Sequence, residues 1–174
     1  MMMFESDRIR LRALEPEDLE WLYKVENNDE LWQYGNSNVP YSKYVLKQYI
    51  AENHSDLYAY GQFRLVAVDK DTEHVVGCGD LVNFTPRHMR AELGIFIFPE
   101  FQGQGLAQET LHLICAYARD FMFLHQIYAF VAESNEKASR LFQRCGFVHQ
   151  STINEWLRTS TDEYMDARIY VRVL

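Results

Sequence analysis

The segment from residue 91 to residue 123 constrains the fold of this chain more than any other. Residues 91–98 form a mostly apolar run with the length of a strand, and the run stops at Pro99. From Leu106 to Phe123, apolar residues recur at the i, i+3 and i+4 positions of a packed helix. Two glycines lie between these runs, so the sequence predicts a strand that leads through a glycine turn directly into a long helix.

The turn is suited to hold an anionic group. It consists of Gln102, Gly103, Gln104, Gly105, Leu106 and Ala107. Glycine lets the backbone approach a ligand closely, and the first N–H groups of a helix point outward with the positive end of the helix dipole behind them. Such a turn binds phosphate or pyrophosphate. It matches neither a Walker loop nor the full Gly-x-Gly-x-x-Gly dinucleotide pattern, and two glycines before a helix are as often plain turn residues.

The rest of the chain alternates between strand and helix periodicity. Strands are predicted at residues 8–13, 63–68, 75–82, 91–98, 127–131, 147–153 and 165–173, and helices at 17–28, 42–53, 106–123 and 135–144. A turn at residues 69–72 joins two of the strands in an antiparallel hairpin. The mixture of hairpins and strand-helix-strand units predicts an α/β (α+β) fold with a single mixed, mostly antiparallel sheet flanked by helices. With 174 residues and no visible linker, residues 1–174 are expected to form one domain.

Charge and hydropathy restrict the classes of partner. A net charge of −8 disfavours nucleic acid, because phosphate binding needs a basic face. It fits a cationic substrate, although an acidic surface also keeps many proteins soluble. No apolar run approaches the roughly 20 residues needed to span a bilayer, and the first residues lack the pattern of a secretory leader. We therefore expect a cytoplasmic protein without a membrane partner.

The cysteines and histidines predict no metal site. Cys78, Cys115 and Cys145 are widely spaced in apolar segments, which is typical of buried free thiols. The six histidines are scattered, and no His-x-x-x-His or Cys-x-x-Cys pair is present.

Two sequence blocks resemble the GNAT superfamily of N-acetyltransferases. Residues 91–107 resemble its acetyl-CoA motif, whose core is Gln/Arg-x-x-Gly-x-Gly/Ala, with Gln102, Gly105 and Ala107 in those places. Residues 135–147 resemble the later "Asn…Ala…Leu-Tyr…Gly-Phe" helix of the family. The blocks stand in the family's order and separation, and the predicted elements fit the GNAT fold along nearly the whole chain. Two further stretches, 11–19 and 26–28, look most like spermidine N-acetyltransferases and next like the N-terminal acetylases of ribosomal proteins.

The resemblance implies an acetyl-CoA-dependent N-acetyltransferase, with acetyl-CoA as cosubstrate. Backbone amides from Gln102 to Ala107 would hold the CoA pyrophosphate, strand residues near Phe96 and Ile97 would pair with the pantetheine arm, and Asn135 would contact the same cofactor. The position of Asn135 equally supports an ordinary helix N-cap, and the two roles are compatible.

Glu92 is the candidate catalytic base. Direct transfer needs a neutral amine to attack the thioester, and a primary amine with a pKa near ~10.4 is neutral only about one part in 10³ at pH 7. Glu92 stands at the start of the cofactor strand, where it could remove the proton directly or through a water. The alternative is a solvent-exposed strand carboxylate or a structural partner of Arg90.

Two features depart from the family pattern. Phe142 occupies the place where polyamine acetyltransferases and many relatives carry a tyrosine that can protonate the departing thiolate. Water or another hydroxyl would then have to supply the proton. Residues 32–41 also lack the acidic pairs that spermidine enzymes place between their first helices, which weakens the spermidine assignment specifically.

Several functional alternatives stay open. The acceptor is expected to be a primary amine, with a polyamine-like small molecule favoured over the α-amine of a peptide. A GNAT-fold module that binds acyl-CoA without turnover is a different class, and Phe142 is its best support. The sequence names neither the amine nor the oligomeric state, and it leaves a homo-oligomer open.

Overall fold

A seven-stranded sheet is the centre of the described chain, which comprises residues 4–32, 38–52, 57–159 and 162–174 of the computed structural model. Its strands are β1 (Ile9–Arg12), β2 (Phe63–Asp69), β3 (Val75–Thr85), β4 (Arg90–Ile97), β5 (Gln126–Ala132), β6 (Val148–Arg158) and β7 (Tyr164–Val173). They lie in the order β1-β2-β3-β4-β5-β7-β6, and β4 and β5 form the parallel pair in an otherwise antiparallel sheet. The predicted mixed, mostly antiparallel sheet is confirmed.

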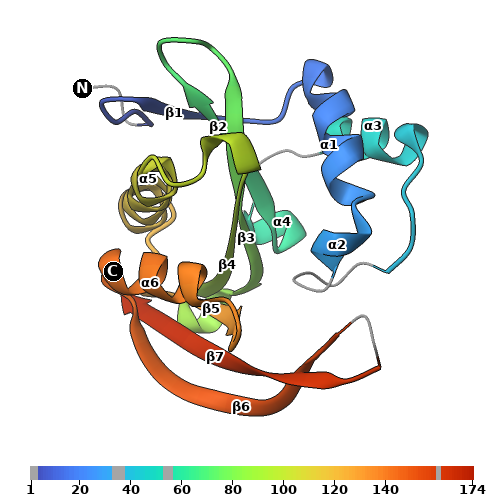
Figure 1. The fold of residues 1–174 in the computed structure, drawn as a ribbon. Coiled ribbons are helices and arrows are strands. Elements are labelled where there is room, and N and C mark those ends of the chain that lie inside the picture. The colour runs from blue at the N-terminus through green and yellow to red at the C-terminus, as the bar shows by residue number, and fades with distance from the viewer. Residues whose placement is uncertain (1–3, 33–37, 53–56, 160–161) are drawn as a thin grey trace.

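Helices cover both faces of this sheet. Those described are α1 (Leu19–Glu26), α2 (Asp29–Trp32), α3 (Lys43–Glu52), α4 (Leu57–Tyr60), α5 (Leu106–Asp120) and α6 (Glu136–Arg144). In Figure 1, α5 and α6 lie on one side of the sheet, and α1, α2 and α3 lie on the other. The β6–β7 hairpin extends as a long curved ribbon beyond both layers.

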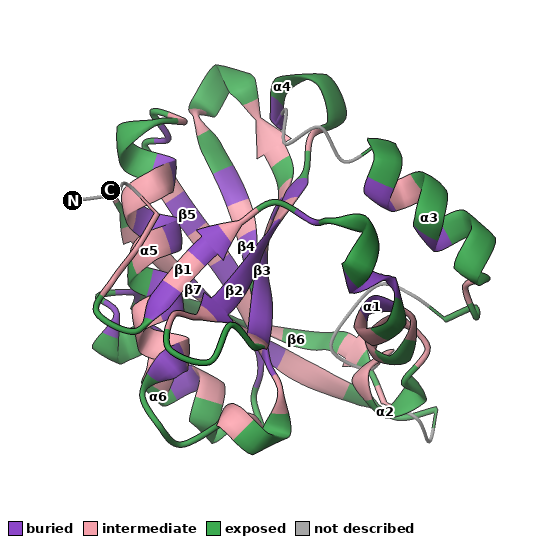
Figure 2. Ribbon diagram, turned by 90° about the horizontal axis from the view of Figure 1, so that it is seen from above, coloured by how far each residue is buried: buried purple, intermediate pink, exposed green. Residues whose placement is uncertain are grey.

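Two apolar cores result, and β2 contributes to both. Leu65 and Ala67 join the larger core, which also contains side chains of α5 and α6, while Val66 and Val68 join a smaller core with residues of α1 and α3. This explains why β2 reads as a continuous apolar run, since alternate side chains enter opposite layers. Figure 2 shows the burial concentrated along the central strands and on the inner sides of the helices.

The first predicted helix, 17–28, is divided in the structure. A 3-10 turn at Pro16–Asp18 precedes α1, which ends at Glu26, and α2 starts separately at Asp29. Asparagines cause the break: the side-chain amide of Asn27 donates to the carbonyl oxygens of Tyr23 and Tyr41, and Oδ1 of Asn28 accepts from the N–H of Glu30. Asparagine competes with the helix for backbone partners in this way.

Other element ends differ more modestly. The helix predicted at 106–123 ends at Asp120, and Phe123 adopts a left-handed φ of 54°. The helix predicted at 42–53 is Lys43–Glu52, and residue 53 lies outside the described residues. The strand predicted at 147–153 is longer in the structure, where β6 ends at Arg158. The prediction was too short because β6 is an exposed edge strand, and its two register shifts break the alternation that marks a strand in sequence.

No helix in the described ranges is long and apolar enough to cross a membrane. The same residues contain no group of His, Cys, Asp and Glu side chains that could hold a metal ion.

Candidate functional site

The site begins where β4 and β5 diverge. Their parallel pairing covers only three positions, in which Arg90, Ala91 and Glu92 lie opposite Gln126, Ile127 and Tyr128. Residues 93–97 of β4 continue without a β5 partner. Backbone N–H and C=O groups on that edge require partners. An extended ligand that lies along the edge can supply them, as a peptide does when it adds a strand to a sheet.

The glycine turn lies directly beyond the open end of β4. Gly103 and Gly105 adopt left-handed φ angles of 76° and 80°, which favour glycine. A Cβ atom added at Gly103 would meet no other atom within 4 Å, so the space above the turn is open. Gly105 is the N-cap of α5, and no side chain caps the helix. The first N–H groups of α5 are therefore available to an anionic ligand, and the turn fits a pyrophosphate.

The two glutamines of the turn shape its backbone. Nε2 of Gln102 donates to the carbonyl oxygen of Ile97 over 3.0 Å, and Nε2 of Gln104 donates to that of Glu100 over 3.1 Å. Leu106 is buried and anchors the start of α5 in the core, while Ala107 is half-buried. The structure thus brings the predicted residues 102–107 together, and their contact with CoA stays a prediction.

Arg8 is a basic residue at this turn that sequence reasoning missed. Its Nη1 donates to the carbonyl oxygen of Gln104 over 2.9 Å, and its Nε donates to Oε1 of Glu109 over 2.6 Å. Residues 99–107 contain no lysine or arginine of their own. Nothing in the sequence separates Arg8 from the other arginines of the first strand region, because the fold alone brings it to a turn 96 residues away.

Phe96 and Ile97 lie on the unpaired part of β4, and Asn135 lies at the start of α6. Ile97 is buried, whereas Phe96 is half-buried and packs edge-on against Phe98 with ring centroids 5.2 Å apart. Oδ1 of Asn135 accepts from the N–H of Ala138 over 3.1 Å. The N-cap role of Asn135 is confirmed, and its contact with the cofactor remains a prediction.

Glu92 lies at the apex of the opening, as the last β4 residue paired with β5. Its Oε2 accepts from Nδ2 of Asn83 over 2.7 Å. Among the ion pairs of the described residues, none joins Glu92 to Arg90, so the proposed structural partnership with Arg90 is absent there. A neutral amide thus orients the Glu92 carboxylate. Asn83 has a left-handed φ of 51° at a bulge of β3, a feature that the sequence did not reveal.

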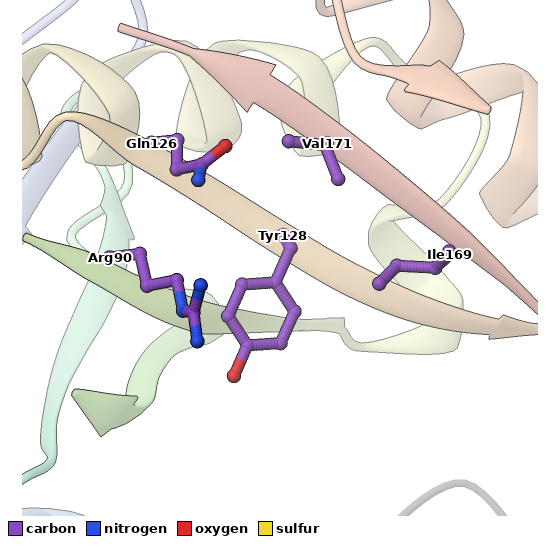
Figure 3. Close-up of a pocket in the computed structure, with 5 residues that line it drawn as sticks. All are labelled: Arg90, Gln126, Tyr128, Ile169 and Val171. Carbon is purple, nitrogen blue, oxygen red and sulfur yellow. The ribbon is translucent and has the colours of Figure 1, made fainter. Parts of the chain in front are cut away.

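Tyr128 faces Glu92 across the two strands. Opposed residues of neighbouring strands have side chains on the same face, so the phenol and the carboxylate share one side of the sheet. A hollow of about 260 Å³ opens there, lined by Arg90, Gln126, Tyr128, Ile169 and Val171 (Figure 3). Burial raises the pKa of Tyr128, the charge of Glu92 raises it further, and Arg90 opposes the change.

Phe142 lies on the α6 side of the sheet and is 4% exposed. Its ring packs edge-on against Phe147 with centroids 5.0 Å apart, and it stacks on Tyr170 at 6.1 Å. This environment is apolar and offers no proton from position 142 itself.

Further carboxylates lie on the Glu92 face. Arg64 donates through Nε and Nη2 to Asp80, over 2.5 and 2.9 Å, and through Nη1 to Glu26 over 2.6 Å. Asp80 is paired with Gly94, which lies two residues from Glu92 along β4. Two carboxylates around one guanidinium leave this group with a net negative charge.

All three cysteines are buried free thiols, as the sequence predicted. Burial raises the pKa of Cys78 to about 12 and the pKa values of Cys115 and Cys145 to about 11. The thiols therefore stay protonated and inert at neutral pH.

Known proteins match the chain over nearly its full length. Residues 8–148 match the family described as "Acetyltransferase (GNAT) domain". Spermidine N(1)-acetyltransferase of Escherichia coli strain K12 is 32% identical over 164 residues, which cover 91% of this chain and 86% of the relative. The crystal structure of spermidine N-acetyltransferase from Vibrio cholerae in complex with CoA and spermine superposes with a TM-score of 0.85 at 28% identity, covering 97% of this chain and 96% of that one. A dodecameric structure of the Vibrio cholerae enzyme gives a TM-score of 0.79 at 29% identity, covering 97% and 95%. The matched family region includes both the turn at 102–107 and the helix that follows Asn135.

Proposed function

Since this chain belongs to the GNAT family and is an acetyl-CoA-dependent N-acetyltransferase, we propose that its acceptor is a polyamine-like primary amine. The observation that carries the proposal is the acidic character of the face that bears Glu92. Glu26, Asp80 and Glu92 contribute three carboxylates there, and Arg64 binds the first two. A polyamine is polycationic at neutral pH, so one end can be held by this face while the other is acetylated.

Residues 32–41 lack the acidic pairs of spermidine enzymes, but the face that bears Glu92 can still attract a polyamine. Part of that segment, 33–37, lies outside the described residues. Glu26 and Asp80 come from α1 and β3 instead, and they are partly exposed, at 24% and 27%. The relatives named above act on spermidine by their names, which supports the same substrate class.

In the proposed mechanism the chain binds acetyl-CoA, orients the two reactants and deprotonates the acceptor amine. Amides of the turn at 102–107 hold the pyrophosphate, and the open edge of β4 lines up the pantetheine arm. Positioning of two reactants accounts for roughly 7–11 kcal/mol of a barrier. Glu92, oriented by Asn83, accepts the proton of the ammonium group, a step that costs roughly 4–5 kcal/mol at pH 7 without a base. Acetyl-CoA supplies the activated acyl group.

The test is release of CoA thiol from acetyl-CoA with a panel of amines. Spermidine and spermine represent polyamines, a monoamine of similar length represents simple alkyl amines, and short peptides represent α-amines. The buried cysteines keep the background of a thiol reagent low. We expect kcat/KM to be highest for a polyamine. A higher value for a peptide α-amine would reject the polyamine proposal in favour of an N-terminal protein acetylase.

We also propose that the protein assembles into a homo-oligomer and acts in the cytoplasm. A relative of similar fold is described as dodecameric. In this chain, β6 is an edge strand with exposed apolar side chains, among them Val148 and Trp156, as an interface between copies would require. Light scattering that reports a monomer at micromolar concentration would reject the assembly.

A further inference from the structure

Phe142 itself has no proton to donate on the α6 side of the opening, whereas the opposite side bears the phenol of Tyr128. Tyr128 belongs to β5, the strand that borders the opening, and it is paired with Glu92 at the apex. We propose that Tyr128 donates the proton that the CoA sulfur takes when the thioester breaks. The inference rests on acetyl transfer beside Glu92, as in the proposed function, and it holds for any acceptor amine.

The location of the sulfur follows from the two ends of the cofactor site. The pyrophosphate turn lies beyond Ile97, and the open edge of β4 runs back from Ile97 to Leu93. At about 3.3 Å per residue this edge is roughly 13 Å long. An arm that starts at the turn and pairs with the edge must end at the apex, because pairing of β4 with β5 closes the path at Glu92. The reacting thioester is then adjacent to Glu92 and Tyr128.

The surroundings of Tyr128 raise its pKa, so the phenol is protonated before the reaction. The charged groups of the described residues that act on it are Glu92 and Arg90, both on β4. Its other neighbours are uncharged: the Phe130 ring lies 5.8 Å away, and Gln126, Ile169 and Val171 line the same hollow. Figure 3 shows the phenol extending from β5 away from β7, with its ring beside the side chain of Arg90 and its oxygen at the end farthest from β5.

Glu92 first takes one proton from the ammonium group and passes it to solvent, and the later proton transfers close within the pair of Glu92 and Tyr128. The amine nitrogen forms a bond to the acyl carbon and gives a proton to the Glu92 carboxylate. The C–S bond breaks, its electron pair goes to sulfur, and the Tyr128 hydroxyl protonates the sulfur. The resulting phenolate recovers a proton from the carboxylic acid of Glu92, directly or through a water. Both residues return to their initial state, and the products are the amide and the CoA thiol.

Tyr170 is the competing phenol, since it stacks on Phe142. It is 2% exposed and belongs to β7, which is separated from the opening by β5. Its hydroxyl is engaged with Arg168. Tyr170→Phe therefore serves as a matched control that removes one phenolic hydroxyl without touching the apex.

The experiment compares kcat, acetyl-CoA affinity and melting temperature for Tyr128→Phe, Tyr170→Phe and the double variant Tyr128→Phe/Phe142→Tyr. The assay needs only an amine that the wild-type protein acetylates, so preference for an unexpected acceptor would reject the proposed substrate and leave this test intact. We expect Tyr128→Phe to lower kcat about 10²-fold, at the lower end of what a positioned acid contributes, with calorimetric affinity for acetyl-CoA unchanged. Tyr170→Phe should stay within twofold of wild type.

The double variant separates proton donation from a structural effect. A phenol at position 142 approaches the sulfur from the opposite face, so it should restore at least tenfold of the lost kcat if Tyr128 is the acid. A folded Tyr128→Phe variant with kcat within twofold of wild type would overturn the assignment. A loss of kcat that Phe142→Tyr does not reverse would also overturn it.

Discussion

Arg8 and Glu109 form an ion pair between the start of β1 and the first turn of α5, with Nε of Arg8 2.6 Å from Oε1 of Glu109. The same guanidinium donates to the carbonyl oxygen of Gln104. It thereby fixes the turn and places a positive charge beside it. The side chain is 45% exposed, so it can also meet the phosphates of CoA.

Arg8→Gln should weaken acetyl-CoA binding about 5- to 20-fold, because the site loses a charge-assisted contact to phosphate and a brace of the turn. Arg10→Gln is the matched control, since Arg10 pairs with Glu73 instead. Calorimetry at two salt concentrations measures both effects. Equal affinities for the two variants would show that Arg8 does not serve the cofactor.

Gly105→Ala should also impair cofactor binding. The φ of 80° strains any side chain, and the new Cβ would lie 3.2 Å from Nη2 of Arg8. Gly61→Ala controls for strain alone, because Gly61 has a φ of 68° and open space around it. Both variants should lose about 1 kcal/mol of stability. Acetyl-CoA affinity should fall only in Gly105→Ala, and unchanged affinity in that folded variant would mean that the cofactor lies elsewhere.

Glu92→Gln should lower turnover by roughly 10²–10⁴ while acetyl-CoA affinity hardly changes, as expected for loss of a general base. The deficit should shrink as pH rises, because more of the amine then arrives neutral. pH–rate profiles of the variant and the wild type test this. Identical profiles would leave Glu92 as a structural residue.

Asn83→Gly tests how much the orientation of Glu92 contributes, because Glu92 itself stays in place. Glycine keeps the left-handed backbone at φ 51° and removes the amide that donates to Glu92. We expect a smaller fall in kcat than for Glu92→Gln, with the pH dependence of the wild type preserved. A loss as large as that of Glu92→Gln would imply that Asn83 itself contacts the reacting groups.

Asp18 should make stability depend on pH. Burial opposes its ionisation, but hydrogen bonds from Arg12, the Glu15 N–H and Trp21 prevail, so the pKa lies below its ordinary value of 3.8. Its stabilisation is therefore present above the unfolded pKa and is lost as pH falls through the folded pKa. Asp18→Asn should lose about 1.5–3 kcal/mol at pH 7 and show a weaker pH dependence below pH 4. Urea melts of both proteins from pH 3 to 7 decide this, and parallel curves would contradict it.

These cases mark what the sequence could and could not predict. The glycine turn, α5 and the N-cap Asn135 were predicted because their signals are local: two glycines, a helical period and a capping residue. The divergence of β4 and β5 has no local signal, since those strands are joined through the whole of α5. Arg8 and Asn83 were missed for the same reason. Arg8 meets Gln104 and Glu109 only in the folded chain. Asn83 adopts a left-handed backbone conformation for which the sequence of β3 gives no signal.

The short pairing of β4 with β5 has a final consequence for the whole molecule. Three residue pairs join the half of the sheet formed by β1–β4 to the half formed by β5, β7 and β6. Beyond these pairs, residues 93–97 of β4 have no β5 partner, and their backbone N–H and C=O groups can bond to a ligand instead. At the cofactor site proposed above, acetyl-CoA would act as a temporary strand along β4 and would complete the sheet between its two halves while it is bound.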